Sequence, residues 1–191
     1  FTSGSTGRPK GWMIRHRAIA NLLSKMKEAL DCVTRPMSCA TTPVFDIFIT
    51  ESLLPLALGK TIILADEDEM LLPWKLAELM ETYQAGFIQF TASRLAMCLT
   101  NESFCRASRH LQFTIVGGEQ VAPALVAKFK EQGGGRLVNL YGPTEAAVYI
   151  TMTDLQENED VTIGRPMGNC RVYVMDENRN HLMPTAVGEL Y

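Results

Sequence analysis

The sequence LVNLYGPTEAAV, residues 137–148, decides the fold class. Its first five residues are apolar apart from Asn139 and predict a short buried strand, and Gly142-Pro143 predicts a turn at the strand's end. In open α/β sheets the carboxyl ends of the strands form the binding crevice, so Tyr141, Thr144 and Glu145 are expected to project into a site. An aromatic ring, a hydroxyl and a carboxylate can there stack on a base, bond a phosphate and hold Mg²⁺. A plain strand-turn-helix, with Glu145 favoured by the helix dipole, explains the same residues without a function.

On both sides of this stretch, strand patterns alternate with helix patterns. Apolar runs predict strands at 61–64, 86–90 and 111–116, and apolar spacing predicts helices at 19–30, 52–58, 73–83 and 123–131. This order predicts an α/β fold with a largely parallel sheet flanked by helices over residues 1–153. The acidic run 66–69 is expected to be a solvated loop. From residue 154 onward, short strand patterns broken by Gly, Pro and Asn predict the start of a small β-rich subdomain, residues 154–191.

The first eleven residues, FTSGSTGRPKG, have the composition of a loop that wraps a polyphosphate. Glycines allow close backbone approach, hydroxyls can donate to phosphate oxygens, and basic side chains add positive charge. The spacing differs from that of the common P-loop, which has four residues between its glycines. A flexible linker rich in glycine and serine is the alternative interpretation. The candidate phosphate-binding residues are Thr2, Ser3, Gly4, Ser5, Thr6, Gly7 and Lys10.

These two stretches, in this order and at this separation, resemble motifs of the adenylate-forming superfamily, especially the adenylation domains of nonribosomal peptide synthetases. Further matches are the pair Phe45-Asp46 and the segments 116–119 (VGGE), 163–166 (IGRP) and 188–191 (GELY). The resemblance covers essentially the whole chain. It implies an internal fragment of the family's large N-terminal domain, without the small C-terminal domain and its catalytic lysine. We therefore expect the fragment to be incomplete for catalysis.

The resemblance also implies a reaction and roles for individual residues. A carboxylate and ATP would give an acyl adenylate and pyrophosphate, followed by transfer to the phosphopantetheine thiol of a peptidyl carrier domain. Thr144 would contact the α-phosphate and Glu145 would hold Mg²⁺, and these two are the catalytic candidates. The adenine would be bound by four residues: Tyr141 would stack on the ring, Asn139 would read the exocyclic amine, and Gly117 and Gly118 would pack flat against it.

Asp46 determines the expected substrate class, because in the peptide-synthetase branch an aspartate at this place pairs with the substrate's α-ammonium. An unpaired buried carboxylate costs several kcal/mol, so an aspartate among Phe45 and Ile47 requires a cation. An N-cap of a following helical turn is the alternative role. By the same matching, the side-chain pocket would be lined by residues whose pattern is similar to pockets that select glycine. They are Ile47, Thr50, Gln89, Ile115, Gly117, Leu140, Val148 and Tyr149.

Composition excludes several other classes. Hydrophobic residues make up 47% and charged residues 20% of the chain, which is ordinary globular usage. A net charge of −3 and a pI near 5.7 argue against nucleic acid as a partner. Five cysteines without a Cys-x-x-Cys pair and three scattered histidines indicate neither a disulfide framework nor a zinc site. The apolar run 47–65 is interrupted by polar residues and Pro55, so no membrane span and a cytoplasmic location are expected.

Two alternative functions remain open at this stage. The chain could be a segment of a ligase that joins fatty or aryl acids to coenzyme A, or a non-catalytic nucleotide-binding relative. Asp46 argues against the first, because those acids carry no ammonium, and the pair Thr144 and Glu145 argues against the second.

Overall fold

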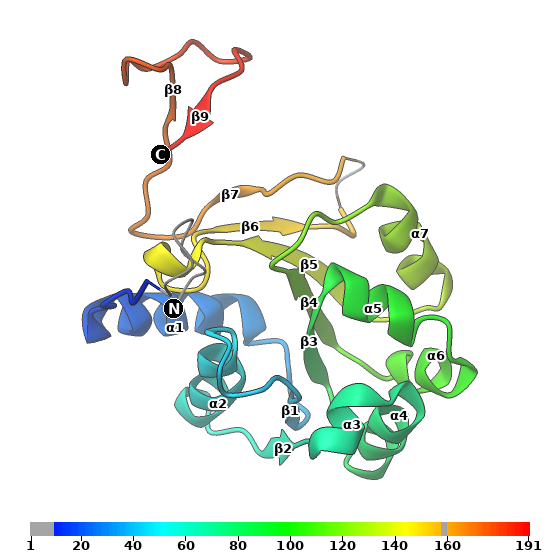
Figure 1. The fold of residues 1–191 in the computed structure, drawn as a ribbon. Coiled ribbons are helices and arrows are strands. Elements are labelled where there is room, and N and C mark those ends of the chain that lie inside the picture. The colour runs from blue at the N-terminus through cyan, green and yellow to red at the C-terminus, as the bar shows by residue number, and fades with distance from the viewer. Residues whose placement is uncertain (1–9, 158–159) are drawn as a thin grey trace.

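The computed structural model describes residues 10–157 and 160–191 of the chain. Within these residues, seven strands form one sheet in the order β2-β1-β3-β4-β5-β6-β7 (Figure 1). The first five strands of this order are parallel, and the last two are antiparallel to their neighbours. The predicted largely parallel sheet is confirmed. The strands are β1 (Met37–Cys39), β2 (Ile62–Leu64), β3 (Phe87–Thr91), β4 (Phe113–Gly117), β5 (Arg136–Tyr141), β6 (Thr151–Asp154) and β7 (Arg165–Pro166).

Helices cover both faces of the sheet, and strand residues alternate between the two faces (Figure 1). On β4, Phe113 and Ile115 pack in one core cluster with the buried side of α1 (His16–Leu30) and α2 (Phe48–Ala57). Val116 packs in the other cluster, against α4 (Pro73–Thr82), α5 (Ala92–Cys98), α6 (Glu102–Ser108) and α7 (Pro123–Glu131). A sheet buried on both faces is the arrangement expected of parallel strands.

The acidic run 66–69 is largely solvent-exposed, as predicted, but it caps and begins a helix, so the prediction of a loop is wrong. Asp66 caps helix α3 (Glu67–Leu71) by accepting a hydrogen bond from the Glu69 backbone nitrogen at 2.8 Å. In return, the Glu69 carboxylate accepts from the Asp66 backbone nitrogen at 2.7 Å. The two acidic residues three positions apart form a capping box. The spacing of Asp66 and Glu69 is the sequence signal for it, whereas the negative charge of the run is not.

Helix and strand boundaries agree with the sequence to different degrees. Helix α7 has the predicted bounds, whereas α2 begins at Phe48, four residues before the predicted start. Strand β1 and helices α5 and α6 were not predicted.

Two short strands follow the main sheet. They are β8 (Val174–Met175) and β9 (Glu189–Leu190), which pair with each other in a separate small sheet (Figure 1). Strand β7 still belongs to the main sheet, because Pro166 is paired with Thr151 of β6. A division of the chain at residue 154 stays a prediction. In the described ranges, the helices fall short of the length and apolar character that crossing a membrane requires.

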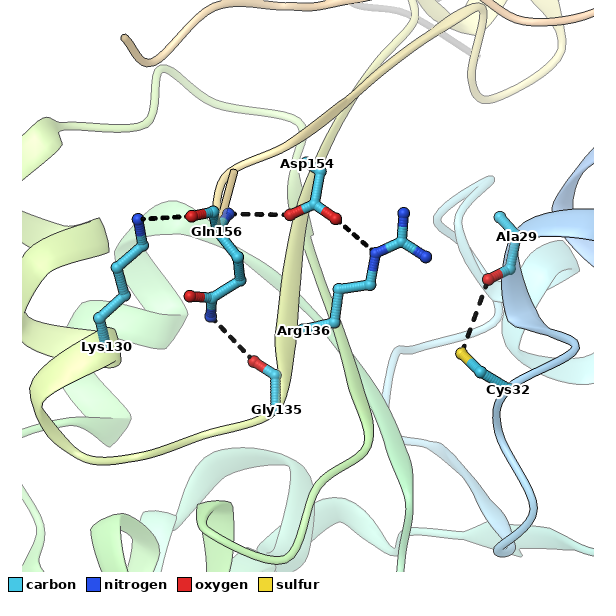
Figure 2. A network of polar contacts seen from close by, with 7 residues as sticks. All are labelled: Ala29, Cys32, Lys130, Gly135, Arg136, Asp154 and Gln156. Atoms are coloured by element: carbon cyan, nitrogen blue, oxygen red, sulfur yellow. Dashed lines mark hydrogen bonds and ion pairs between the residues drawn. The ribbon is translucent and has the colours of Figure 1, made fainter. Parts of the chain in front are cut away.

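A polar network ties the amino end of β5 to the end of β6 (Figure 2). Arg136 of β5 forms an ion pair with Asp154 of β6, and Asp154 also accepts from the Gln156 backbone nitrogen at 2.8 Å. The Gln156 amide donates to the Gly135 carbonyl at 3.1 Å, and Lys130 of α7 donates to the Gln156 carbonyl at 3.5 Å. These bonds hold the antiparallel pair at the end of the sheet opposite to the carboxyl end of β5.

Candidate active site

Three adjoining cavities lie beyond the carboxyl ends of β3, β4 and β5. We name them after one residue of each: the Asp46 cavity, of about 780 Å³, the Glu145 cavity, of about 600 Å³, and the Tyr141 cavity, of about 470 Å³. Tyr149 lines both the Asp46 and the Glu145 cavities. Gly118 and Gly142 line both the Asp46 and the Tyr141 cavities. The Asp46 cavity therefore stands between the other two.

Asp46 lies in the loop between β1 and α2. It is half-buried rather than buried, and among the described residues we find no hydrogen bond or ion pair to its carboxylate. The N-cap position of α2 is Ile47, which makes no side-chain cap, so the alternative role of Asp46 as an N-cap is not seen. Phe45 is 61% exposed beside it. The Asp46 carboxylate is thus available to a ligand in the Asp46 cavity.

The predicted substrate residues fall into two groups, those that line the Asp46 cavity and those that do not. Phe45, Asp46, Ile47, Val148 and Tyr149 line the cavity. The remaining five are buried and do not line it, although Leu140 lines the Tyr141 cavity: Thr50, Gln89, Ile115, Gly117 and Leu140.

Hydrogen bonds among the buried group keep its polar atoms occupied. The Thr50 hydroxyl donates to the Ile47 carbonyl at 2.7 Å and lies 3.2 Å from Oε1 of Gln89. The Gln89 amide nitrogen donates to the same carbonyl at 3.4 Å. A Cβ at Gly117 would lie 2.3 Å from the Leu140 carbonyl oxygen, so only glycine allows β4 and β5 to approach this closely. The floor is closed by packing and by satisfied polar groups.

The Tyr141 cavity gathers three of the four predicted adenine residues. Tyr141, Asn139 and Gly118 line it, whereas Gly117 lies behind. The Asn139 amide nitrogen donates to the Thr162 carbonyl at 2.8 Å, which leaves its Oδ1 as the free acceptor. Gly118 has a φ of 76°, a left-handed conformation that favours glycine. An acceptor beside an aromatic ring suits a planar base that carries an amino group.

The Glu145 cavity is lined by one carboxylate and three basic side chains, Arg15, Arg17 and Lys25. Thr144 and Glu145 belong to the short 3₁₀ helix η1 (Thr144–Ala146), yet Thr144 lines the Asp46 cavity instead. Ala147 and Val148 follow with left-handed φ values of 60° and 73°. The predicted catalytic pair therefore spans the boundary between two cavities.

The donor set of the Glu145 cavity fits Mg²⁺ beside a phosphate. Mg²⁺ in nucleotide sites is commonly held by one or two carboxylates together with substrate phosphates, and Glu145 supplies one exposed carboxylate. A cluster of three or more His, Cys, Asp or Glu side chains able to hold a metal is absent from residues 10–157 and 160–191. Of the predicted phosphate loop, residues 2–7 lie outside the described residues, and Lys10 is exposed before α1.

Two charged residues near the cavity were missed by the sequence analysis, the buried Glu51 and the half-buried Arg94. Glu51 of α2 is fully buried, and burial raises the pKa of its carboxyl group from 4.5 to about 7. Arg94 of α5 lines the Asp46 cavity, and burial lowers the pKa of its guanidinium. A sequence signal for Glu51 exists, because a single carboxylate inside the apolar run 47–65 must find buried partners.

Comparisons with known proteins agree with this geometry. The pattern of the family described as "AMP-binding enzyme" matches residues 1–191. The chain is 34% identical to a dimodular nonribosomal peptide synthase of Bacillus subtilis (strain 168), covering 100% of this chain and 8% of that protein. It is 31% identical to tyrocidine synthase 2 of Brevibacillus parabrevis, covering 5% of that protein. The chain thus spans less than a tenth of both relatives.

Solved structures show the same fold. A four-domain nonribosomal peptide synthetase bound to AMP and glycine superposes with a TM-score of 0.86 and 30% identity, covering 95% of this chain and 14% of that chain. The adenylate-bound peptide synthetase FmoA3 superposes with the same TM-score of 0.86 at 22% identity, which shows the fold alone.

Proposed function

Because the chain belongs to the family of AMP-binding enzymes, we propose that it forms the nucleotide- and substrate-binding part of an amino-acid adenylating ligase of nonribosomal peptide synthesis. One observation carries this proposal: the cavity that holds the Asp46 carboxylate, unpaired among the described residues, adjoins both a cavity lined by Tyr141 and Asn139 and a cavity lined by Arg15, Arg17 and Lys25. The reaction requires an amino acid, an adenosine and a pyrophosphate to lie together around the reacting α-phosphate. The similarity to amino-acid-activating synthetases supports the same assignment.

In the proposed reaction, a carboxylate oxygen of the amino acid forms a bond to the α-phosphorus of ATP. The bond between that phosphorus and the bridging oxygen of pyrophosphate breaks, and the electron pair leaves with pyrophosphate. The nucleophile is already ionised, so this chain needs no general base, and its residues act by positioning and by electrostatics. Mg²⁺, when bound at Glu145, would neutralise charge on the departing phosphates. Thr144, which lines the Asp46 cavity, would contact the α-phosphate.

The nucleoside and the amino acid would each be held by a named group. Oδ1 of Asn139 would accept from the exocyclic amine of adenine, whose ring would stack on Tyr141 next to Gly118. The Asp46 carboxylate would pair with the α-ammonium of the amino acid. The phosphopantetheine thiol of a peptidyl carrier domain would then attack the acyl carbon of the adenylate, and AMP would leave.

Glycine, or another small amino acid, is the proposed substrate. Thr50, Gln89 and Leu140 are buried, and none of them lines the Asp46 cavity. The set of predicted pocket residues is similar to pockets of the family that select glycine. The relative bound to AMP and glycine supports the same choice.

The test is ATP–pyrophosphate exchange by the intact adenylation domain that contains this chain, measured over a panel of amino, fatty and aryl acids. Exchange with one small amino acid is expected, and Asp46→Ala should abolish it. Exchange with fatty or aryl acids alone would assign the chain to the coenzyme A ligases, and exchange with no acid would leave a nucleotide-binding scaffold.

A further inference from the structure

The backbone of Ala40, directly after β1, is held from two sides by charged side chains, the buried Glu51 and the half-buried Arg94. Oε2 of Glu51 accepts from the backbone nitrogens of Ala40 and Thr41, both at 2.9 Å. Oε1 of Glu51 accepts from the Thr41 hydroxyl at 2.9 Å. On the other side, Nη1 of Arg94 donates to the Ala40 carbonyl at 2.6 Å. Ala40 and Thr41 are buried, so water cannot replace a lost partner.

Glu51 fastens the two ends of the loop that carries Asp46. The loop leaves β1 at Ala40 and enters α2 at Phe48, and Glu51 lies one turn inside that helix. Its bonds to Ala40 and Thr41 therefore join the start of the loop to the helix that follows it. Fixing both ends of a short segment restricts the conformations that the segment can adopt. The Asp46 carboxylate has no hydrogen bond to described residues, and only the backbone carbonyl of Asp46 is held, by the Ile49 nitrogen at 3.0 Å.

Arg94 extends the same connection to other parts of the cavity wall. Its Nη2 donates to the Met70 carbonyl of α3 at 2.8 Å, and its guanidinium lies 5.5 Å from the ring centroid of Phe90 on β3. Ala40, Met70 and Phe90 all line the Asp46 cavity. One side chain thus links three separate segments of that wall.

We propose that Glu51 and Arg94 are positioning residues for the amino-acid substrate: by holding the Ala40 backbone, they set where Asp46 stands in the cavity. This inference rests on the proposed function, because it takes the substrate's ammonium as the partner of Asp46. Glu51 acts through hydrogen bonds to the backbone and not through its charge.

The geometry of Glu51 distinguishes a positioning role from a charge role. Both backbone nitrogens donate to one carboxylate oxygen, and the other oxygen contacts only a hydroxyl. A glutamine can keep these contacts, since its amide oxygen accepts from both nitrogens and its amide nitrogen donates to the Thr41 hydroxyl oxygen. An alanine keeps none of them.

The experiment compares variants of the intact adenylation domain by amino-acid-dependent ATP–pyrophosphate exchange. Glu51→Ala should raise KM for the amino acid about tenfold, because buried donors lose their acceptor, while KM for ATP changes less than about twofold. Glu51→Gln should stay within about twofold of the wild type in both constants. Arg94→Met should raise the amino-acid KM, whereas the matched Arg106→Met, at an exposed arginine paired with Glu81, should not.

A second variant separates positioning from loss of stability. Leu54→Ala opens a cavity in the core on the same helix, away from the Ala40 backbone, and should lower the melting temperature without raising the amino-acid KM. The proposal is overturned if Glu51→Gln is as impaired as Glu51→Ala, if Glu51→Ala leaves KM unchanged, or if Leu54→Ala raises KM equally.

Hydrogen exchange of the amides in segment 40–47 gives a readout that does not depend on activity. Glu51→Ala should exchange faster there than Glu51→Gln and the wild type. If the wild type activates no amino acid, the proposed function is refuted. Hydrogen exchange of segment 40–47 would still show whether Glu51 holds this segment. Equal protection in all three proteins would overturn the inference itself.

Discussion

Thr50 and Gln89 meet beneath the Asp46 cavity, where the threonine hydroxyl oxygen lies 3.2 Å from the glutamine amide oxygen. The two residues come from α2 and β3, which are separated by 39 positions in the sequence. Both are 0% exposed, and both also contact the Ile47 carbonyl. The depth of the cavity is therefore set by a hydrogen-bonded pair, and changing either side chain changes the space available to a substrate.

Shortening Gln89 is expected to open the cavity downward. In Gln89→Ala, kcat/KM for alanine relative to glycine should rise about tenfold, because one methylene in a pocket is worth roughly 10- to 200-fold in discrimination. Pyrophosphate exchange by the intact domain with each amino acid gives this ratio. Gln112→Ala is the matched control, since Gln112 bonds the Thr34 backbone nitrogen and lies outside the cavity lining. An unchanged ratio in Gln89→Ala would contradict the assignment of the floor.

Asn139 is expected to act on the nucleotide and not on the amino acid. In Asn139→Ala, KM for ATP should rise about tenfold through loss of the acceptor, with KM for the amino acid nearly unchanged. Exchange rates measured at varied ATP concentrations test this. Asn101→Ala removes an asparagine that caps α6 by accepting from the Phe104 nitrogen at 3.0 Å. The Asn101→Ala control should lose stability and keep its KM for ATP. An equal rise of KM for ATP in both variants would refute the role of Asn139 in binding the nucleotide.

Glu51 is expected to make stability depend on pH. Burial raises the pKa of Glu51 from 4.5 to about 7, so the folded protein binds this proton more tightly than the unfolded chain. The resulting stabilisation is fully present below about pH 4.5 and is lost as the pH rises through about 7, a change of about 3 kcal/mol. Urea unfolding of the wild type between about pH 5 and pH 8 should show this decrease. Glu51→Gln does not titrate, so an identical decrease in that variant would assign the effect to another group.

The capping box of α3 is expected to support one wall of the Asp46 cavity, because Met70 and Leu71 at its end line that cavity. Asp66→Ala should lower the free energy of unfolding by about 1 kcal/mol. Denaturant unfolding measures this. Asp68→Ala breaks only a surface ion pair with Lys75 and should cost less, since exposed pairs contribute about 0–1 kcal/mol. Equal losses in the two variants would show that the cap adds nothing beyond surface charge.

Much of the fold was predictable from local patterns. Strand β5 is apolar from Leu137 to Tyr141 apart from Asn139, and α7 has a proline at its first position and glycines after its end, so both were placed from the sequence. Strand β1 has only three residues and α5 and α6 have seven each, which is too short for a clear periodicity. Helices α5 and α6 also carry local signals, the N-caps Thr91 and Asn101, but their packing in the core is not visible in a local pattern.

The site was predictable where its residues stand in motifs at strand ends. Asn139 and Tyr141 were expected together and line one cavity. Thr144 and Glu145 line different cavities, and a left-handed turn follows η1. The residue types in this stretch did not predict that turn. Glu51 was missed because its partners are backbone atoms of Ala40 and Thr41, which a reading of side-chain types does not reveal.

The left-handed pair Ala147 and Val148 shows that this site is maintained against the chain's own conformational preferences. A non-glycine residue in that region costs about 1–3 kcal/mol, and valine is less suited to it than most because it is branched at Cβ. Selection for stability alone would place glycine at position 148. The valine side chain instead forms part of the Asp46 cavity wall. Sequences optimised toward the most stable variant would thus be expected to drift away from selective activity at this turn.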